Sequence, residues 1–293
     1  MRILCIHAHF DDYEFTAAGT FELWRRKAGP DFQAKLLVCT DGRGGHQFRT
    51  REETGRLRLM EQMESARIGG YEFELLRLPD GEVPREAGLQ IAPPLLAALW
   101  KAIRDFEPDY LFCPPGPADP LSGVHLDHVA VAEAVRKVAY LINVPHAFTP
   151  EYPTDETRSR SQTTPVILTV FDGYQFGENS YDLAVDIGAA FPKTCEMSYC
   201  HQSQIREWLP WVGRHGMKAP DSLEDWTDQM RQRLARRNAI LGITSSAPAE
   251  VFTVTAWGAL PSVAQLKSDF PQLLSEACHF GRLEEKLNRW SGL

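Results

Sequence analysis

The 293-residue sequence has no excess of positive charge and no long apolar run. Its formal net charge is −8, so it lacks the lysine and arginine surplus with which proteins neutralise nucleic-acid phosphates. It has no stretch of about 18 consecutive apolar residues that could cross a bilayer. The first residues reach His7 and Asp11 too soon for a signal peptide. We therefore expect a cytoplasmic protein that binds neither nucleic acid nor membrane.

Cysteine pairs with CxxC spacing are also missing. The six cysteines are scattered along the chain, which argues against a zinc site built from cysteine pairs and gives no sign of a disulfide framework. With 43% hydrophobic and 24% charged residues, the remaining composition is that of an ordinary globular protein. A metal site in this chain would have to use other side chains.

Short apolar runs alternate with helical patterns along most of the chain. The runs at 2–8, 34–39, 73–78, 110–113 and 166–171 predict strands buried on both faces of a parallel sheet. Apolar residues at helical spacing predict helices at 14–27, 51–68, 91–106, 125–142 and 187–207. This order predicts an α/β fold, a Rossmann-like doubly wound and mostly parallel sheet with helices on both faces.

Two segments depart from this order. Residues 145–165 are rich in proline, threonine, serine and charge, which predicts a long surface loop. Residues 205–293 have a largely helical pattern, and the charged run 231–237 predicts a solvated helix face. We expect one domain over residues 1–204 and a helical extension over 205–293 that packs on the same domain.

Polar residues gather after two of the expected strands. Residues 9–14 contain one histidine and three carboxylates, and residues 125–128 contain two histidines and an aspartate. Ligands of doubly wound sheets bind beyond the carboxyl ends of the strands, where both segments are expected to lie. Imidazole and carboxylate together suit zinc or ferrous iron, and catalytic zinc takes three protein ligands. The sequence therefore predicts a metal site shared by the two segments.

These segments resemble the HxDDxE and HxDH motifs of the LmbE/PIG-L family of zinc-dependent N-deacetylases, which includes N-acetylglucosaminyl deacetylases. The resemblance covers roughly the first two thirds of the chain and includes Gly19-Thr20, Thr40-Asp41-Gly42, Arg58-x-x-Glu61, Asp186-Ile187 and His201-Gln202-Ser203-Gln204. It implies a hydrolase of linear amides that removes an N-acyl group, above all acetyl, from an amino sugar or its conjugate.

The resemblance also implies a role for each residue of the metal site. His9, Asp12 and His128 are the implied metal ligands, and Asp11 is the implied general base that deprotonates a metal-bound water. The implied cofactor is Zn²⁺, with another divalent metal such as Fe²⁺ left open. The implied partner is a small N-acetylated sugar or glycoconjugate, and a homo-oligomer is left open.

Further residues are implied around this site. His125 matches a second acid/base or oxyanion-stabilising group, which Asp127 is expected to orient, and Arg58 and Asp80 match sugar-contacting groups. Which of Asp11 and His125 protonates the leaving amine stays open. Phe10 stands where the family usually has proline, and its side chain is one that can line the pocket.

Two other functions account for part of these observations. A non-catalytic sugar-binding module would keep the metal and the pocket but would have no need of a base at Asp11. In a Rossmann nucleotide-binding protein the histidines would be incidental, but no GxGxxG follows the first strand. His7 lies on that buried strand, and we expect it to be a hydrogen-bonded core histidine.

Overall fold

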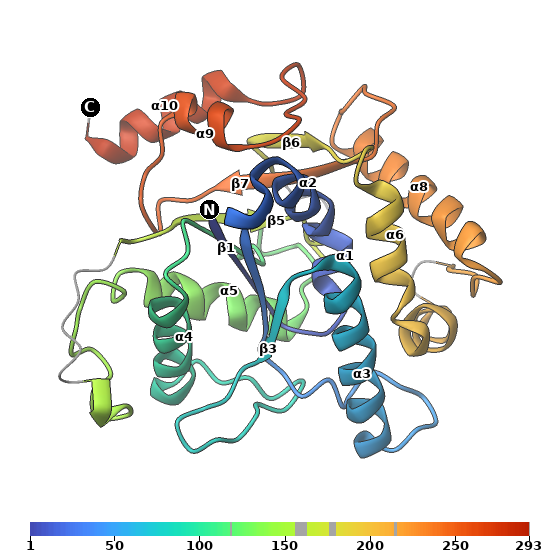
Figure 1. Cartoon of the computed structure of the whole chain (residues 1–293), viewed down its shortest axis with the longest axis horizontal. Helices are drawn as coiled ribbons and strands as arrows, with labels where there is room; N and C mark the ends of the chain where they lie inside the picture. The colour runs from blue at the N-terminus through green and yellow to red at the C-terminus, as the bar shows by residue number, and fades with distance from the viewer. Residues whose placement is uncertain (118, 156–162, 176–179, 214–215, 293) are drawn as a thin grey trace.

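A seven-stranded sheet forms the centre of the computed structural model, which describes residues 1–117, 119–155, 163–175, 180–213 and 216–292 (Figure 1). The strands are β1 (Arg2–His7), β2 (Gln33–Val38), β3 (Glu72–Leu75), β4 (Tyr110–Cys113), β5 (Val166–Val170), β6 (Leu183–Asp186) and β7 (Ala249–Val254). Their order is β3-β2-β1-β4-β5-β7-β6. The first five strands in this order are parallel, and β7 pairs antiparallel with β5 and β6. The expected mostly parallel sheet is confirmed.

Helices cover both faces of this sheet. They are α1 (Asp12–Thr16), α2 (Ala18–Ala28), α3 (Arg51–Gly69), α4 (Pro93–Phe106), α5 (Leu126–Ala139), α6 (Phe191–Tyr199), α7 (Leu209–Val212), α8 (Leu223–Ile240), α9 (Val263–Asp269) and α10 (Phe280–Ser291). Ile3 and Cys5 of β1 face the core that contains residues of α2 and α6, whereas Leu4 and Ile6 face the core under α4 and α5. Because both faces of β1 are buried, its sequence is continuously apolar.

The strand order reverses between β1 and β4. In doubly wound sheets, ligands bind beyond the carboxyl ends of the strands at the point where the strand order reverses. Residues 8–11 connect β1 to α1, and residues 114–125 connect β4 to α5. The topology thus brings the two motif segments to the same edge of the sheet.

The C-terminal segment contributes to the sheet as well as to the helices that cover it. We expected residues 205–293 to be largely helical, yet β7 lies inside the sheet, and β6 was not expected either. Glu250 of β7 accepts hydrogen bonds from the backbone N–H groups of Gly19 (2.9 Å) and Thr20 (2.7 Å) in the first turn of α2. A carboxylate at the N-terminus of a helix accepts hydrogen bonds from free N–H groups and interacts favourably with the helix dipole. The expected boundary at residue 204 therefore falls between two strands of one sheet.

Two expected helices are interrupted. Residues 14–27 form α1 and α2, which are separated at Ala17, and residues 187–207 form α6 followed by the π-helical segment η3 (Ser203–Trp208). Ser203 is held by Glu61 of α3, which accepts hydrogen bonds from its backbone N–H (2.8 Å) and its hydroxyl (2.6 Å). This contact between distant segments cannot be read from helical periodicity.

Part of the expected loop at 145–165 can be described. Pro153–Asp155 forms a short 3₁₀ turn, and residues 156–162 lie outside the described residues. In the part of the chain that is described, none of the helices combines the length and the apolar character needed to cross a membrane.

Phe10 belongs to the hydrophobic core. It is fully buried, and its ring centroid lies 5.9 Å from that of Phe73. Gly42, which has a left-handed φ of 62°, packs directly on this ring, and a Cβ atom at Gly42 would lie 2.3 Å from two of the ring carbons. Phe10 therefore supports the loop after β2 instead of lining a pocket.

This packing predicts that Gly42→Ala destabilises the protein more than another left-handed glycine does. Gly70→Ala is the control, because Gly70 has a φ of 66° but only an ordinary contact at 3.6 Å. We expect Gly70→Ala to lower the free energy of unfolding by about 1 kcal/mol and Gly42→Ala by about 2 to 4 kcal/mol, since overpacking adds to backbone strain. Urea denaturation of both variants measures the difference, and equal losses would contradict the packing of Phe10.

Candidate metal centre

Three ligand atoms converge beyond the carboxyl ends of β1 and β4. His9 Nδ1 lies 3.2 Å from Asp12 Oδ2, and His128 Nε2 lies 3.3 Å from each of these atoms. Ligand atoms bound tetrahedrally to zinc at about 2.0 to 2.1 Å are separated by about 3.3 Å. The three atoms therefore have the spacing of one face of a zinc tetrahedron, and two imidazoles with a carboxylate are donors that zinc accepts.

Other residues offer overlapping ligand sets. The donor atoms of His9, His125 and His128, and those of His7, Asp12 and His128, also lie within 4.8 Å of one another. His7 Nδ1 lies only 2.6 Å from Asp12 Oδ2, which is a hydrogen-bonding distance and shorter than the separation of two ligands on one zinc. His7 is thus a buried histidine that supports Asp12, as its position on β1 predicted.

Asp11 and Asp12 point in different directions because of the backbone between β1 and α1. Asp11 has a φ of 80°, in the left-handed region that costs a side-chain-bearing residue about 1 to 2 kcal/mol. Its backbone N–H donates to Gln62 Oε1 (3.1 Å), and its carboxylate lies 3.4 Å from the Arg58 guanidinium. Asp12 faces the histidines, so the two neighbouring carboxylates are available for separate tasks.

The surroundings of Asp11 set its protonation. Burial raises the pKa of Asp11 to about 6, the positive charge of Arg58 opposes this rise, and the negative charge of Asp12 adds to it. The pKa stays below 7, so the carboxylate is mostly ionised at neutral pH and can accept a proton. This is the protonation state that the implied general base requires.

Glu14, the third carboxylate of residues 9–14, binds side chains that support the backbone of Asp11. Glu14 is fully buried, and its Oε1 accepts hydrogen bonds from Gln62 Nε2 and the Tyr71 hydroxyl, each at 2.8 Å, and from Ser65. His201 Nε2 lies 3.4 Å from the same oxygen and is also fully buried. Since Gln62 also holds the backbone of Asp11, Glu14 and His201 support the turn that carries Asp11.

Each of the two histidines among the implied ligands contacts a second carboxylate through its other ring nitrogen. His9 Nε2 lies 3.1 Å from Asp127 Oδ2, and His128 Nδ1 lies 3.1 Å from Asp172 Oδ2. Such carboxylates hold the ring of a metal-ligating histidine in one orientation and one tautomer. They leave Nδ1 of His9 and Nε2 of His128 free to face the metal position.

Asp127 differs from the expectation, because its carboxylate lies on His9 and not on the ring of His125. His125 is the N-cap residue of α5, and its Nδ1 accepts a hydrogen bond from the backbone N–H of Asp127 (3.3 Å). Side chains two residues apart on a helix lie on opposite sides of its axis, and the side chain of Asp127 contacts His9 in the turn after β1. Its Oδ2 also accepts a hydrogen bond from Ala87 N–H (2.8 Å).

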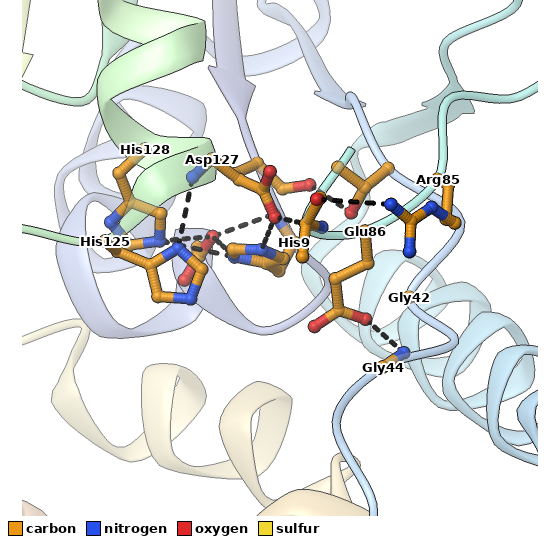
Figure 2. Close-up of polar contacts among 12 residues, drawn as sticks. His9, Gly42, Gly44, Arg85, Glu86, His125, Asp127 and His128 are labelled. Atoms are coloured by element: carbon orange, nitrogen blue, oxygen red, sulfur yellow. Dashed lines mark hydrogen bonds and ion pairs between the residues drawn. The ribbon is translucent and has the colours of Figure 1, made fainter. Parts of the chain in front are cut away.

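Figure 2 shows His9, His125 and His128 turned toward one another. The ring centroid of His125 lies 4.5 Å from that of His9 and 4.7 Å from that of His128. Burial, together with the positive charges of His9 and His128, lowers the pKa of His125 to about 4. His125 is therefore a neutral imidazole at neutral pH.

The implied sugar-contacting residues lie in different environments. Arg58 reaches the site but is buried, and its guanidinium donates to the backbone oxygen of Phe10 (2.9 Å) as well as pairing with Asp11. Asp80 is exposed on the loop after β3, where its Oδ1 accepts a hydrogen bond from the Glu82 N–H (3.0 Å). A sugar-contacting role for either residue stays a prediction.

Asp172 was missed in the sequence. It lies two residues after the end of β5 and is the first carboxylate after the expected strand at 166–171. The rule that functional residues follow the carboxyl ends of parallel strands would have included it.

Comparison with known proteins gives a family match and a shared fold. Residues 4–139 match the PIG-L family, described as GlcNAc-PI de-N-acetylase, and this range contains both motif segments. No curated protein sequence matches the chain.

Solved structures extend the comparison to the whole fold. N,N′-diacetylchitobiose deacetylase from Pyrococcus horikoshii has a TM-score of 0.63 at 21% identity, covering 87% of this chain and 83% of that chain. The hydratase GalB from Pseudomonas putida, which acts on 4-carboxy-2-hydroxymuconate, has a TM-score of 0.60 at 18% identity, covering 87% and 95%. The conserved protein TT1542 from Thermus thermophilus has 0.59 at 22%, covering 86% and 93%. Since a deacetylase and a hydratase share this fold, the fold alone does not determine the reaction.

The histidine environments predict that metal binding releases protons. Burial opposes a charge on either ring, but Asp12 and Asp127 raise the pKa of His9 to about 9, and Asp12 and Asp172 raise that of His128 to about 10. Both rings are protonated below these values in metal-free protein, and a divalent metal must displace both protons. The affinity for zinc should therefore rise with pH between 6 and 8, by up to about 100-fold per pH unit. Calorimetry in buffers of different ionisation enthalpy measures the number of protons released. Zinc binding without proton release would contradict the assigned ligands.

Asp172→Asn should weaken zinc binding by about 10- to 100-fold, because the carboxylate that orients His128 is lost. Asparagine keeps the oxygen that accepts the hydrogen bond from Tyr174 N–H (2.8 Å), so the turn should survive. Asp127→Asn should have a similar effect through His9. If Asp127 instead orients only His125, its variant would turn over more slowly with unchanged zinc affinity. Competition with a zinc-binding dye distinguishes these results.

Proposed function

We propose, from the match of residues 4–139 to the PIG-L family, that the protein is a metal-dependent hydrolase that removes an acetyl group from the nitrogen of an amino sugar or its conjugate. The observation that carries the proposal is the triangle of His9 Nδ1, Asp12 Oδ2 and His128 Nε2, with sides of 3.2 to 3.3 Å. Beside it stands Asp11, a carboxylate that the triangle does not use. A binding module would need the first feature but not the second.

His9, Asp12 and His128 would hold the metal. Zinc bound there would supply Lewis acidity, which polarises the amide carbonyl and lowers the pKa of water. Asp127 and Asp172 keep the two histidines oriented toward it. The protein's own contribution to the chemistry then comes from Asp11 and His125.

Asp11 takes the proton from the attacking water as the oxygen bonds to the carbonyl carbon. The same proton is then given to the amide nitrogen as the carbon–nitrogen bond breaks, which yields acetate and a free amine. Arg58, 3.4 Å away, favours the ionised carboxylate before attack. Its charge also favours return of the proton to the leaving amine.

His125 is suited to donating a hydrogen bond and not to holding an extra proton. Its Nδ1 accepts the Asp127 N–H, so the proton of the neutral ring is on Nε2. Because its pKa is lowered to about 4, chiefly by burial, the ring has no extra proton to donate to the amine at neutral pH. We assign it to stabilising the developing negative charge on the carbonyl oxygen, which leaves Asp11 as the group that protonates the amine.

The proposal predicts that Asp11→Asn separates binding from turnover. Asparagine has nearly the same shape, so the fold, zinc content and product binding should be retained while turnover falls by at least about 10²-fold. Acetate release from methyl glycosides of N-acetylglucosamine and zinc stoichiometry are measured on one preparation. Full turnover in a zinc-loaded variant would refute the base, and loss of zinc would mean that the two aspartates exchange roles. A wild-type protein that binds zinc and the glycosides without releasing acetate would be a sugar-binding module.

A further inference from the structure

Hydrogen bonds hold residues 84–88 between the candidate metal centre and the loop after β2. The backbone N–H of Asp41 donates to Pro84 O (2.9 Å), and the N–H of Glu86 donates to Asp41 Oδ1 (3.0 Å). The next N–H, of Ala87, donates to Asp127 Oδ2 (2.8 Å), the oxygen that contacts His9. Ala87 has a φ of 59°, a left-handed conformation that alanine rarely adopts. The position of Glu86 is therefore determined by contacts on both sides.

The carboxylate of Glu86 is held by one of its two oxygens. Oε2 accepts a hydrogen bond from Gly44 N–H (2.6 Å) and lies 3.5 Å from Arg58 Nη1. A Cβ atom at Gly44 would lie 2.9 Å from the carboxyl carbon, so only glycine allows this approach. Among the described residues, Oε1 has no hydrogen-bond partner. Figure 2 shows Glu86 between the histidine cluster and the segment that contains Gly42 and Gly44.

Arg58, the expected sugar-contacting residue, is already engaged within the protein. Its side chain is 3% exposed, and its two terminal nitrogens lie against Phe10 O, Gly42 O, Asp11 and Glu86. Glu86 is 13% exposed and keeps one carboxylate oxygen available. Glu86 is therefore better placed than Arg58 to contact a ligand.

We propose that Glu86 determines sugar specificity by accepting hydrogen bonds from ring hydroxyl groups of the substrate whose acetamido group lies at the metal centre. The inference rests on the proposed function. An ionised carboxylate only accepts hydrogen bonds, and its bonds to hydroxyl groups are charge-assisted and about twice as strong as neutral ones. A site built around such an acceptor binds a polyhydroxylated ring and rejects an analogue that lacks the hydroxyl.

Two variants test this role in different ways. Glu86→Gln removes the charge at constant shape, and Gly44→Ala keeps the charge but displaces the carboxylate. Each should raise KM for the methyl glycoside of N-acetylglucosamine by about tenfold or more, with kcat changed by less than about threefold. Glu82→Gln is the control, because it makes the same charge change at an exposed position of the same loop. Its KM should match that of the wild type.

Deoxy sugars distinguish hydroxyl recognition from a merely structural role. Wild type and Glu86→Gln are compared on the 3-, 4- and 6-deoxy glycosides. We expect one deoxy glycoside to be a poor substrate of the wild type and to show no further loss with Glu86→Gln. If Glu86→Gln lowers activity equally on all glycosides, Glu86 only supports Arg58 and the loop, and the proposal is overturned. An unchanged KM in both Glu86→Gln and Gly44→Ala would also overturn it.

Failure of the proposed function gives a different result. In that case the zinc-loaded wild type releases no acetate from any glycoside. Calorimetry then measures the binding of methyl glucosaminide to the same preparations and tests whether Glu86 contacts the sugar. Binding that Glu86→Gln weakens by about tenfold would support the sugar contact without catalysis, whereas no binding, or binding unaffected by the substitution, would overturn it.

Discussion

Asp12 is a partly buried carboxylate, with 16% of its side chain exposed, that lies among three imidazoles. The arrangement of the site depends on that cluster. Its Oδ2 lies 2.6 Å from His7, 3.2 Å from His9 and 3.3 Å from His128. Burial alone would raise the pKa of Asp12, but His7, His128 and His9 hold it well below its ordinary value. A charge that is largely removed from water is stable only when it is paired. The strand β1, the turn after it and helix α5 are therefore joined at one point.

Further hydrogen bonds hold the residues around Asp12 in position. Asp127 and Asp172 hold two of the imidazoles, and Asp127 is in turn fixed by the backbone of Ala87. Glu14 holds Gln62, which binds the backbone of Asp11. The segments that supply these groups lie far apart in the sequence, between residues 9 and 172, so the geometry of the site depends on tertiary contacts.

The sequence predicted those features that local patterns encode. Strand β1 was predicted because both of its faces are apolar, and the meeting of His9 with His128 was predicted because both follow parallel strands. Strands β6 and β7 were missed because they pair with each other across more than 60 residues of chain, which no local pattern shows. The helix expected at 187–207 was wrong after Tyr199, where Ser203 binds Glu61 of α3. Asp127 was assigned to a neighbour in sequence, whereas its carboxylate contacts His9, and Glu86 is marked only by its contact with Gly44.

The most direct test is a crystal structure of the zinc-loaded protein with the metal located by its anomalous scattering. We expect one zinc ion bound to His9 Nδ1, Asp12 and His128 Nε2 at about 2.0 to 2.2 Å, with Asp11 close by but not coordinated. A zinc ion bound by His7 or His125 in place of one of these ligands, or coordinated by Asp11, would contradict the assignment of the site and the mechanism that follows from it.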